Sequence, residues 1–135
     1  MLIEPTVLEI KNLVQDLWDE QNRRQYVYPT LADGVTVTAH PTAWTLGSFA
    51  SAIPLGTIAV PFYIYAAHVT DLSVAGDYEM VLYQVITEIG RFSFSNEVEG
   101  LRIGVISAIA NTQIRAKLAC SVGGATAKIK LWYHL

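Results

Sequence analysis

The chain has few of the residues from which disulfide frameworks and cationic surfaces are built. Its 135 residues include a single cysteine, Cys120, and only 16% are charged, whereas about a quarter of an average soluble domain is charged. One cysteine excludes an internal disulfide framework and indicates synthesis in a reducing compartment. The nine Lys and Arg residues are scattered, so the chain lacks the basic stripe that binds nucleic-acid phosphates.

Long apolar runs are also lacking. No run reaches the 18 or more apolar residues of a membrane helix, because Pro54, Pro61 and His68 interrupt the most apolar stretch. The N-terminal sequence MLIEPTVLEI has no basic start followed by an apolar block and a small-residue cleavage site. We therefore expect a soluble chain with no signal peptide and no membrane partner.

Motifs that carry chemistry are absent as well. The sequence contains no Walker-type phosphate loop, GxGxxG, HExxH, CxxC or GxSxG. His40, His68 and His134 are too far apart to supply two metal ligands from one element, and we interpret them as structural. Cys120 falls on a predicted inward face, where it behaves as a small hydrophobe. We expect no enzymatic activity, no cofactor and no metal.

Two sets of residues have both a functional and a structural interpretation. Asp71, Asp77 and Glu79 are of the types that hold calcium or form glycosidase acid pairs, but the sequence DLSVAGDYEMVLY fits a turn followed by a strand. Trp44 and Trp132 suit stacking on sugar rings, although aromatic side chains also fill ordinary sheets. The structural interpretation is the simpler one for both sets.

Apolar residues, by contrast, are abundant. The types AVILMFWYC make up 52% of the chain, and a chain of this length forms one domain with one core. A core of this size does not absorb all of that apolar surface, so the surplus predicts a surface for a partner or for copies of the chain. The alternative is a tightly packed sandwich with an uncharged polar exterior.

The first twenty residues have a helical pattern that differs from the rest of the chain. Apolar residues recur at alternating spacings of four and three, and Pro5 suits a first helical turn. About two heptads are too short to hold a coiled coil alone, so the predicted helix lies on its own domain or docks on a neighbouring subunit. The apolar stripe consists of Ile3, Val7, Ile10, Val14, Leu17 and Trp18.

After residue 34 the apolar period changes to two. Residues 21 to 34 form a predicted linker or extended arm, which divides the chain into an arm over 1–33 and a β-domain over 34–135. We expect an all-β, antiparallel, jelly-roll-like sandwich of about eight strands. The predicted strands cover residues 35–39, 44–50, 57–73, 77–84, 87–95, 101–108, 112–121 and 125–134.

The last two predicted strands have the clearest alternation. The intervening sequence SVGGA contains Gly123 and Gly124, which tolerate the positive φ of a tight turn, so we expect the two strands to pair as a hairpin. The residues predicted to face the core are Ile114, Ala116, Leu118 and Cys120 in the first strand and Ala127, Ile129, Leu131 and Tyr133 in the second.

The sequence FYIYAAHV predicts a strand that is apolar on both faces. Such a strand is central in a sandwich, or its outer side is covered by a subunit or an arm. Tyr63 and Tyr65 are on the face that we assign to self-association. Alternation places Phe62, Ile64 and Ala66 on one face and Tyr63, Tyr65, Ala67 and Val69 on the other.

Over residues 34 to 134 the chain resembles small proteins encoded among the head genes of tailed bacteriophages. The matching segments are AWTLGSF (Ala43 to Phe49), DYEMVLY (Asp77 to Tyr83), EIGRFSF (Glu88 to Phe94) and the closing block from Ala110 to His134. None of these segments is a catalytic signature.

The resemblance implies a virion component of the capsid decoration, or cement, type. Such proteins commonly bind as trimers between capsomers, often with a terminal arm, so it implies the major capsid protein as partner and the capsid surface as location after synthesis in the host cytoplasm. The apolar stripe would then anchor the arm to the capsid or to a sister subunit. The alternative is a tail or fibre module that binds host glycans.

Overall fold

The computed structural model describes residues 25–30 and 32–135, and within them the chain forms nine strands and no helix. In chain order the strands are β1 (Gln25–Tyr28), β2 (Val35–Thr38), β3 (Ala50–Ile53), β4 (Phe62–Thr70), β5 (Tyr78–Gln84), β6 (Thr87–Phe94), β7 (Val98–Ala108), β8 (Ile114–Cys120) and β9 (Thr126–His134).

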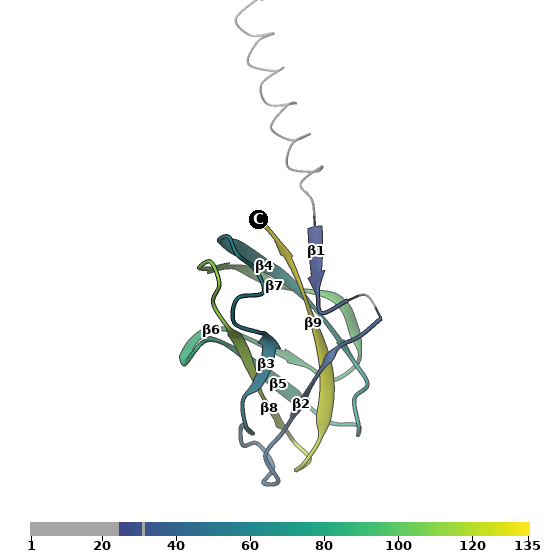
Figure 1. The fold of residues 1–135 in the computed structure, drawn as a ribbon. Helices are drawn as coiled ribbons and strands as arrows, with labels where there is room; N and C mark the ends of the chain where they lie inside the picture. Colours follow the sequence, from purple (N-terminus) through teal and green to yellow (C-terminus); the bar gives the residue numbers. More distant parts are fainter. Residues whose placement is uncertain (1–24, 31) are drawn as a thin grey trace, which may run out of the picture.

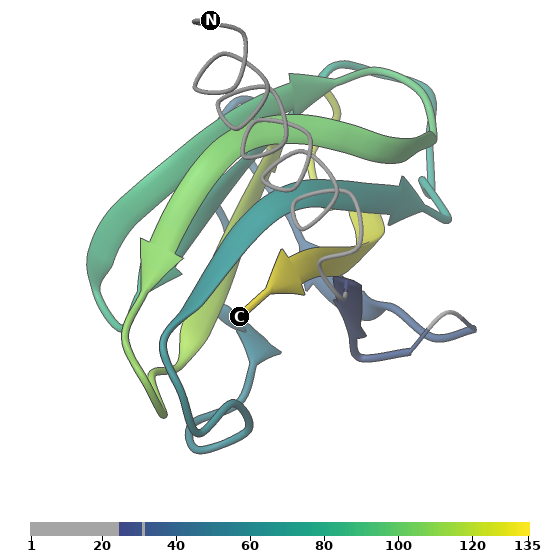
Figure 2. The same ribbon diagram turned by 90° about the horizontal axis from the view of Figure 1, so that it is seen from above.

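The strands form two antiparallel sheets around one interior (Figure 1). Among the described residues, one sheet has the order β1-β9-β4-β7, with β2 beside β1 on the same edge of β9, and the other has the order β3-β8-β5-β6. Seen from above, both sheets are strongly curved and β1 lies close to the C-terminus (Figure 2). The prediction of an all-β antiparallel sandwich is confirmed.

A single apolar core fills the space between the sheets. Apolar residues at every second position point into it, as the alternation predicts for β5, β8 and β9. Cys120 is buried there as a free thiol. The largest side chains that are fully buried in the core include Phe62, Ile64, Tyr78, Met80, Leu82, Ile114, Leu118, Ile129 and Leu131.

The predicted hairpin between β8 and β9 is wrong, because these strands belong to different sheets. The segment 121–125 crosses from one sheet to the other and is held by the loop after β2. The Gly124 N–H donates to the His40 carbonyl (3.0 Å), and a Cβ at Gly123 would overlap the Pro41 carbonyl oxygen. Gly123 therefore allows a close backbone approach rather than a hairpin turn.

Two predicted strands have wrong boundaries. Residues 44–49 are not a strand, because Trp44 has a φ of 63° and Gly47 lies so close to Thr38 that a Cβ would overlap its carbonyl oxygen. The strand predicted over 57–73 is shorter, since β4 begins only after Pro61 and ends before Asp71, whose φ is 53°. A backbone contact between loops, which the sequence does not reveal, decides the first case, and the residues that flank β4 decide the second.

The predicted linker contains a strand. β1 pairs with the last four residues of β9, from Gln25 opposite His134 to Tyr28 opposite Leu131. β2 continues along the same edge of β9, so the sheet begins before residue 34. β1 has only four residues and an incomplete alternation, which is why the sequence pattern missed it.

The predicted faces of β4 are correct only in its first half. Ile64 pairs with Tyr133 and Ala66 with Trp132, so Tyr65 is an extra residue that forms a β-bulge against β9. One extra residue reverses the alternation. Beyond the bulge, Ala67 and Val69 therefore belong to the core cluster and Ala66 does not.

Candidate interaction surfaces

The predicted apolar stripe lies outside the described residues. Ile3, Val7, Ile10, Val14, Leu17 and Trp18 all precede Gln25, the first residue that the structure describes. The place where this segment joins the domain is defined, because Gln25 is paired with His134 at the end of β9. The helical arm therefore stays a prediction, attached at a known point of the sandwich.

Tyr63 and Tyr65 are brought together on the outer face of the five-stranded sheet. Tyr63 is exposed and Tyr65 is half-buried. Both rings pack on His134, with centroid distances of 5.2 Å for Tyr63 and 5.7 Å for Tyr65. His134 thus has a local packing role, as predicted, and the three rings form an aromatic row near the C-terminus.

An open hollow of about 250 Å³ adjoins this row. Trp132 and Tyr65 supply aromatic walls, and Arg102 and Gln25 supply polar groups. Burial raises the pKa of the Tyr65 hydroxyl, and the positive charge of Arg102 lowers it in part. The Trp132 hollow therefore combines flat apolar surfaces with hydrogen-bonding groups.

The second predicted tryptophan lines a different hollow. Trp44 is strongly exposed and borders an open depression of about 360 Å³ with Asp77, Glu79 and Ser93. The Trp44 N–H donates to the Cys120 carbonyl (2.7 Å), which fixes its left-handed backbone. The two tryptophans are thus on separate surfaces.

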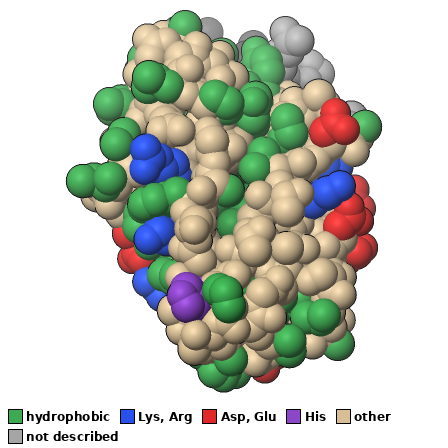
Figure 3. Space-filling model, turned by 60° about the horizontal axis from the view of Figure 1, so that its bottom comes forward, with side chains coloured by type: hydrophobic (Ala, Val, Ile, Leu, Met, Phe, Trp, Pro, Cys, Tyr) green, Lys and Arg blue, Asp and Glu red, His purple; other side chains and the backbone are tan. Residues whose placement is uncertain are grey.

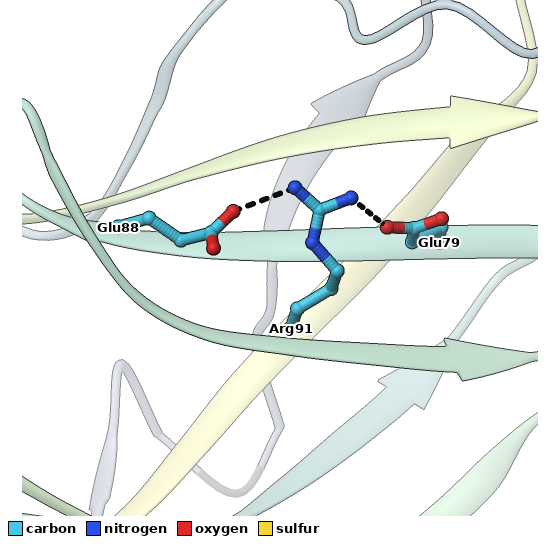
Figure 4. Close-up of polar contacts among 3 residues, drawn as sticks. All are labelled: Glu79, Glu88 and Arg91. Carbon is cyan, nitrogen blue, oxygen red and sulfur yellow. Dashed lines mark hydrogen bonds and ion pairs between the residues drawn. The ribbon is translucent and has the colours of Figure 1, made fainter.

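The acidic residues are used in turns and surface ion pairs. Arg91 bridges Glu79 and Glu88 on the outer face of the four-stranded sheet (Figure 4), with 2.6 Å between Arg91 Nη2 and Glu88 Oε1. These hydrogen bonds, first with Glu88 and then with Glu79, raise the pKa of the Arg91 guanidinium. The backbone of Asp77 links two loops, because its N–H donates to Ser121 Oγ (2.9 Å) and its carbonyl accepts from the Ser121 N–H (2.9 Å).

The same outer face carries two cations that lie over aromatic rings. Lys117 Nζ is 4.2 Å from the centroid of the Phe49 ring, and the Arg115 guanidinium carbon is 4.9 Å from it. The Phe49 ring packs edge-on against Tyr83. Such contacts stabilise a charge at the surface. These four side chains therefore contact one another in the folded chain and do not form an open binding site.

No candidate metal or membrane element is found in the part of the chain that the structure describes. Within residues 25–30 and 32–135, no three His, Cys, Asp or Glu side chains are grouped so that they could hold an ion. No helix there is long and apolar enough to span a bilayer. His40 accepts a hydrogen bond from the Thr42 N–H at its Nδ1 (2.9 Å).

A surface that the sequence analysis missed lies where β4 begins and where β3, β5, β7 and β9 end. Three loops meet there. The Gly56 N–H donates to the Asn111 carbonyl (3.0 Å), and the Val85 N–H donates to the Gln113 carbonyl (3.1 Å). We call this surface the aliphatic end, defined by Leu55 (74% exposed), Val60 (44%), Val85 (45%), Ile86 (74%) and Ile109 (62%).

The loops of the aliphatic end contain no Asp, Glu, Lys or Arg. This holds for residues 54–61, 84–87 and 109–113. Depletion of charge together with exposed apolar side chains is typical of the centre of a protein interface. The sequence did contain this information, but only the fold shows that the three uncharged segments adjoin.

The opposite end of the sandwich has a different character. It is formed by the loops 39–49, 71–77, 95–97 and 121–125, and we call it the polar end. In the view that brings the bottom of Figure 1 forward, apolar side chains are scattered among uncharged surface and charged ones lie toward the margins (Figure 3). Its loops are tied by side chains, for example Ser73 Oγ, which accepts from the Thr126 N–H (2.8 Å).

Comparison of the chain with protein-family models, with curated proteins and with solved structures found no match.

Proposed function

We propose that the chain is a virion structural protein, a capsid decoration or cement protein that binds the outside of a phage head. It bridges subunits of the major capsid protein and stabilises the shell, and it acts as a homo-oligomer, a trimer in the arrangement that the resemblance implies. It works through contacts alone and has no enzymatic role.

The observation that carries this proposal is the apolar surface that the core leaves uncovered. The aliphatic end keeps large side chains in water, and the residues before Gln25 add a further apolar stripe. Removing apolar area from water contributes about 25 cal/mol per Å² before the costs of association. Many copies on one shell then act together through avidity.

In this proposal the two predicted groups of residues have different tasks. The stripe from Ile3 to Trp18 anchors the arm to the capsid or to a sister subunit. Tyr63 and Tyr65, whose rings pack on His134 at the outer face of β4 and β9, contribute an aromatic contact surface. Aromatic side chains are enriched at the centres of interfaces.

Decoration of expanded capsids that lack the protein tests the proposal. The full chain is expected to bind at a fixed number of copies per particle, visible by electron microscopy, and to raise the temperature at which the shells break. A chain without residues 1–20 should show much lower occupancy. If the full chain does not bind, the proposed capsid role is wrong, and if the shortened chain binds equally, the arm has no anchoring role.

A glycan-binding tail or fibre module is the second candidate, favoured by the Trp132 hollow. A tryptophan face beside Arg102 and Gln25 suits the apolar face and the hydroxyl groups of a sugar ring. Glycan-array binding that is lost in Trp132→Ala and kept in Trp44→Ala would favour this function. Binding to no glycan by the full chain would exclude it.

A further inference from the structure

We infer that the Trp132 hollow binds a sugar ring that carries a carboxylate, such as a uronic acid or a sialic acid. The inference rests on the second candidate function, glycan binding, and names the class of glycan that the site selects. It does not depend on the capsid as partner.

A row of residues across three neighbouring strands gives the hollow its shape. Ala66 of β4 is paired with Arg102 of β7 on one side and with Trp132 of β9 on the other. Two strand spacings separate Arg102 from Trp132, which is about 10 Å. In this row only the methyl group of Ala66 lies between them. The hollow of about 250 Å³ is smaller than the pockets that hold drug-sized ligands, so it suits a single ring.

A bulge in β7 turns Arg102 toward the hollow. Arg102 is four residues before the buried Ile106, so strict alternation would place both side chains on the core face. However, residues 103–105 lie between the same pairs as the single residue Tyr65, and Gly104 has a φ of 81°. Arg102 is therefore exposed on the outer face. Such bulges often re-aim a side chain beside a functional site.

The aromatic walls are held by their neighbours. The Tyr65 ring stacks on His134 with an interplanar angle of 26°. Trp132 is half-buried, and its backbone is paired with Val27 of β1 and with Ala66 of β4. Flat faces of this kind cover the apolar face of a sugar ring. Because the walls are ordered before binding, the entropic cost of holding a ligand is low.

The charge of the lining selects the ligand. Of the described residues that line the hollow, Arg102 alone is charged. Elsewhere Arg91 bridges two carboxylates and Arg115 donates to Gln113 Oε1 (3.1 Å), whereas the Arg102 guanidinium forms no ion pair with any described residue. A guanidinium binds a carboxylate through two parallel hydrogen bonds. A carboxylate on the bound ring supplies this partner, and a neutral sugar does not.

NMR titration of the full chain with two matched pairs of probes tests the inference. The first pair is the methyl glycoside of N-acetylneuraminic acid and the methyl ester of the same glycoside. The second pair is methyl glucuronide and methyl glucoside. In at least one pair the acid should bind at least about tenfold more tightly than its uncharged counterpart, because only the acid forms a charge-assisted pair with Arg102.

Variants of Arg102 locate the preference in this hollow. Arg102→Gln should abolish the preference for the acid, and Arg102→Lys should keep only part of it, because lysine lacks the planar fork. Arg115→Gln removes an arginine from the other sheet and should leave the preference unchanged. Arg102 is exposed, so the unfolding midpoints of its variants should match that of the unsubstituted protein.

Several results would overturn the inference. Equal binding of acids and uncharged probes would do so while leaving glycan binding intact, as would an acid preference that survives in Arg102→Gln. Tighter binding of methyl glucoside 6-sulfate than of either acid would assign the site to sulfated sugars instead. Binding of no probe would also overturn it, and the glycan array with Trp132→Ala then decides separately whether the glycan-binding function stands.

Discussion

The two ends of the sandwich close the same core by different means. At the polar end, side-chain hydrogen bonds add to the backbone bonds between the loops, as in the Asp71 N–H bond to Glu97 Oε1 (3.0 Å) and the Tyr78 hydroxyl bond to the Val74 carbonyl (2.6 Å). At the aliphatic end, most of the bonds that link the loops join backbone groups, and large apolar side chains point outward. The polar end thus has additional side-chain hydrogen bonds between its loops, whereas the aliphatic end keeps large aliphatic side chains in water.

Glycine substitutions should show the largest difference between the ends. Gly47→Ala at the polar end places a Cβ on the Thr38 carbonyl oxygen and should cost about 3 kcal/mol or more. Gly56→Ala at the aliphatic end meets no atom within 4 Å but keeps a φ of 78°, so it should cost only about 1 kcal/mol. Urea unfolding of both variants measures this, and equal costs would contradict it.

The Tyr78 hydroxyl should make the polar end sensitive to alkaline pH. Burial raises the pKa of Tyr78 above the usual value of about 10. The folded state then holds this proton more tightly than the unfolded state. The contribution of Tyr78 to the free energy of unfolding is therefore fully present below about pH 10 and is lost as the pH rises through the folded pKa.

Removal of this hydroxyl tests the expected pH dependence. Tyr78→Phe should lose about 1 kcal/mol at neutral pH, because the Val74 carbonyl loses its partner. Between pH 9 and pH 12, about the range in which tyrosine titrates, the free energy of unfolding of Tyr78→Phe should also fall less than that of the unsubstituted protein. Tyr63→Phe is the exposed control, and identical alkaline losses in the parent and Tyr78→Phe would refute the assignment.

Deleting a hydroxyl group should change the free energy of unfolding in opposite directions at the two ends. Thr112, in a loop of the aliphatic end, has a buried hydroxyl with no hydrogen-bond partner among the described residues. Thr112→Val should therefore stabilise the protein by about 1 kcal/mol. Ser73→Ala at the polar end should instead cost about 1 kcal/mol, because the Thr126 N–H loses its acceptor. Thermal unfolding of the two variants measures the contrast, and a loss of stability in both would contradict it.

The smallest effect is expected from the exposed ion pair near the polar end. Lys128 Nζ lies 3.2 Å from Asp71 Oδ2, and both side chains are well exposed. Asp71→Asn should therefore cost less than about 0.5 kcal/mol. The cost should vanish at high salt, since salt screens exposed charges. A larger cost that persists in salt would mean that Asp71 has a structural role beyond this pair.

Much of the β-domain was predictable because alternation depends on neighbours in the chain. Ile114, Leu118, Ile129 and Leu131 face the core as their spacing requires. The candidate surfaces were predictable only in part. Tyr63 and Tyr65 are on the outer face as expected, but the aliphatic end was missed, because its segments, residues 54–61, 84–87 and 109–113, are separated in the sequence and meet only in the fold.

The sequence by itself determined the fold class, the residues that line most of the core and the surplus of apolar surface, since these follow from composition and local period. Only the tertiary structure decided that β8 and β9 belong to different sheets, that Tyr65 forms a bulge and that the uncharged loops share one end. Those outcomes depend on backbone approaches between distant segments, such as Gly123 against Pro41. A period along the chain contains no information about such contacts.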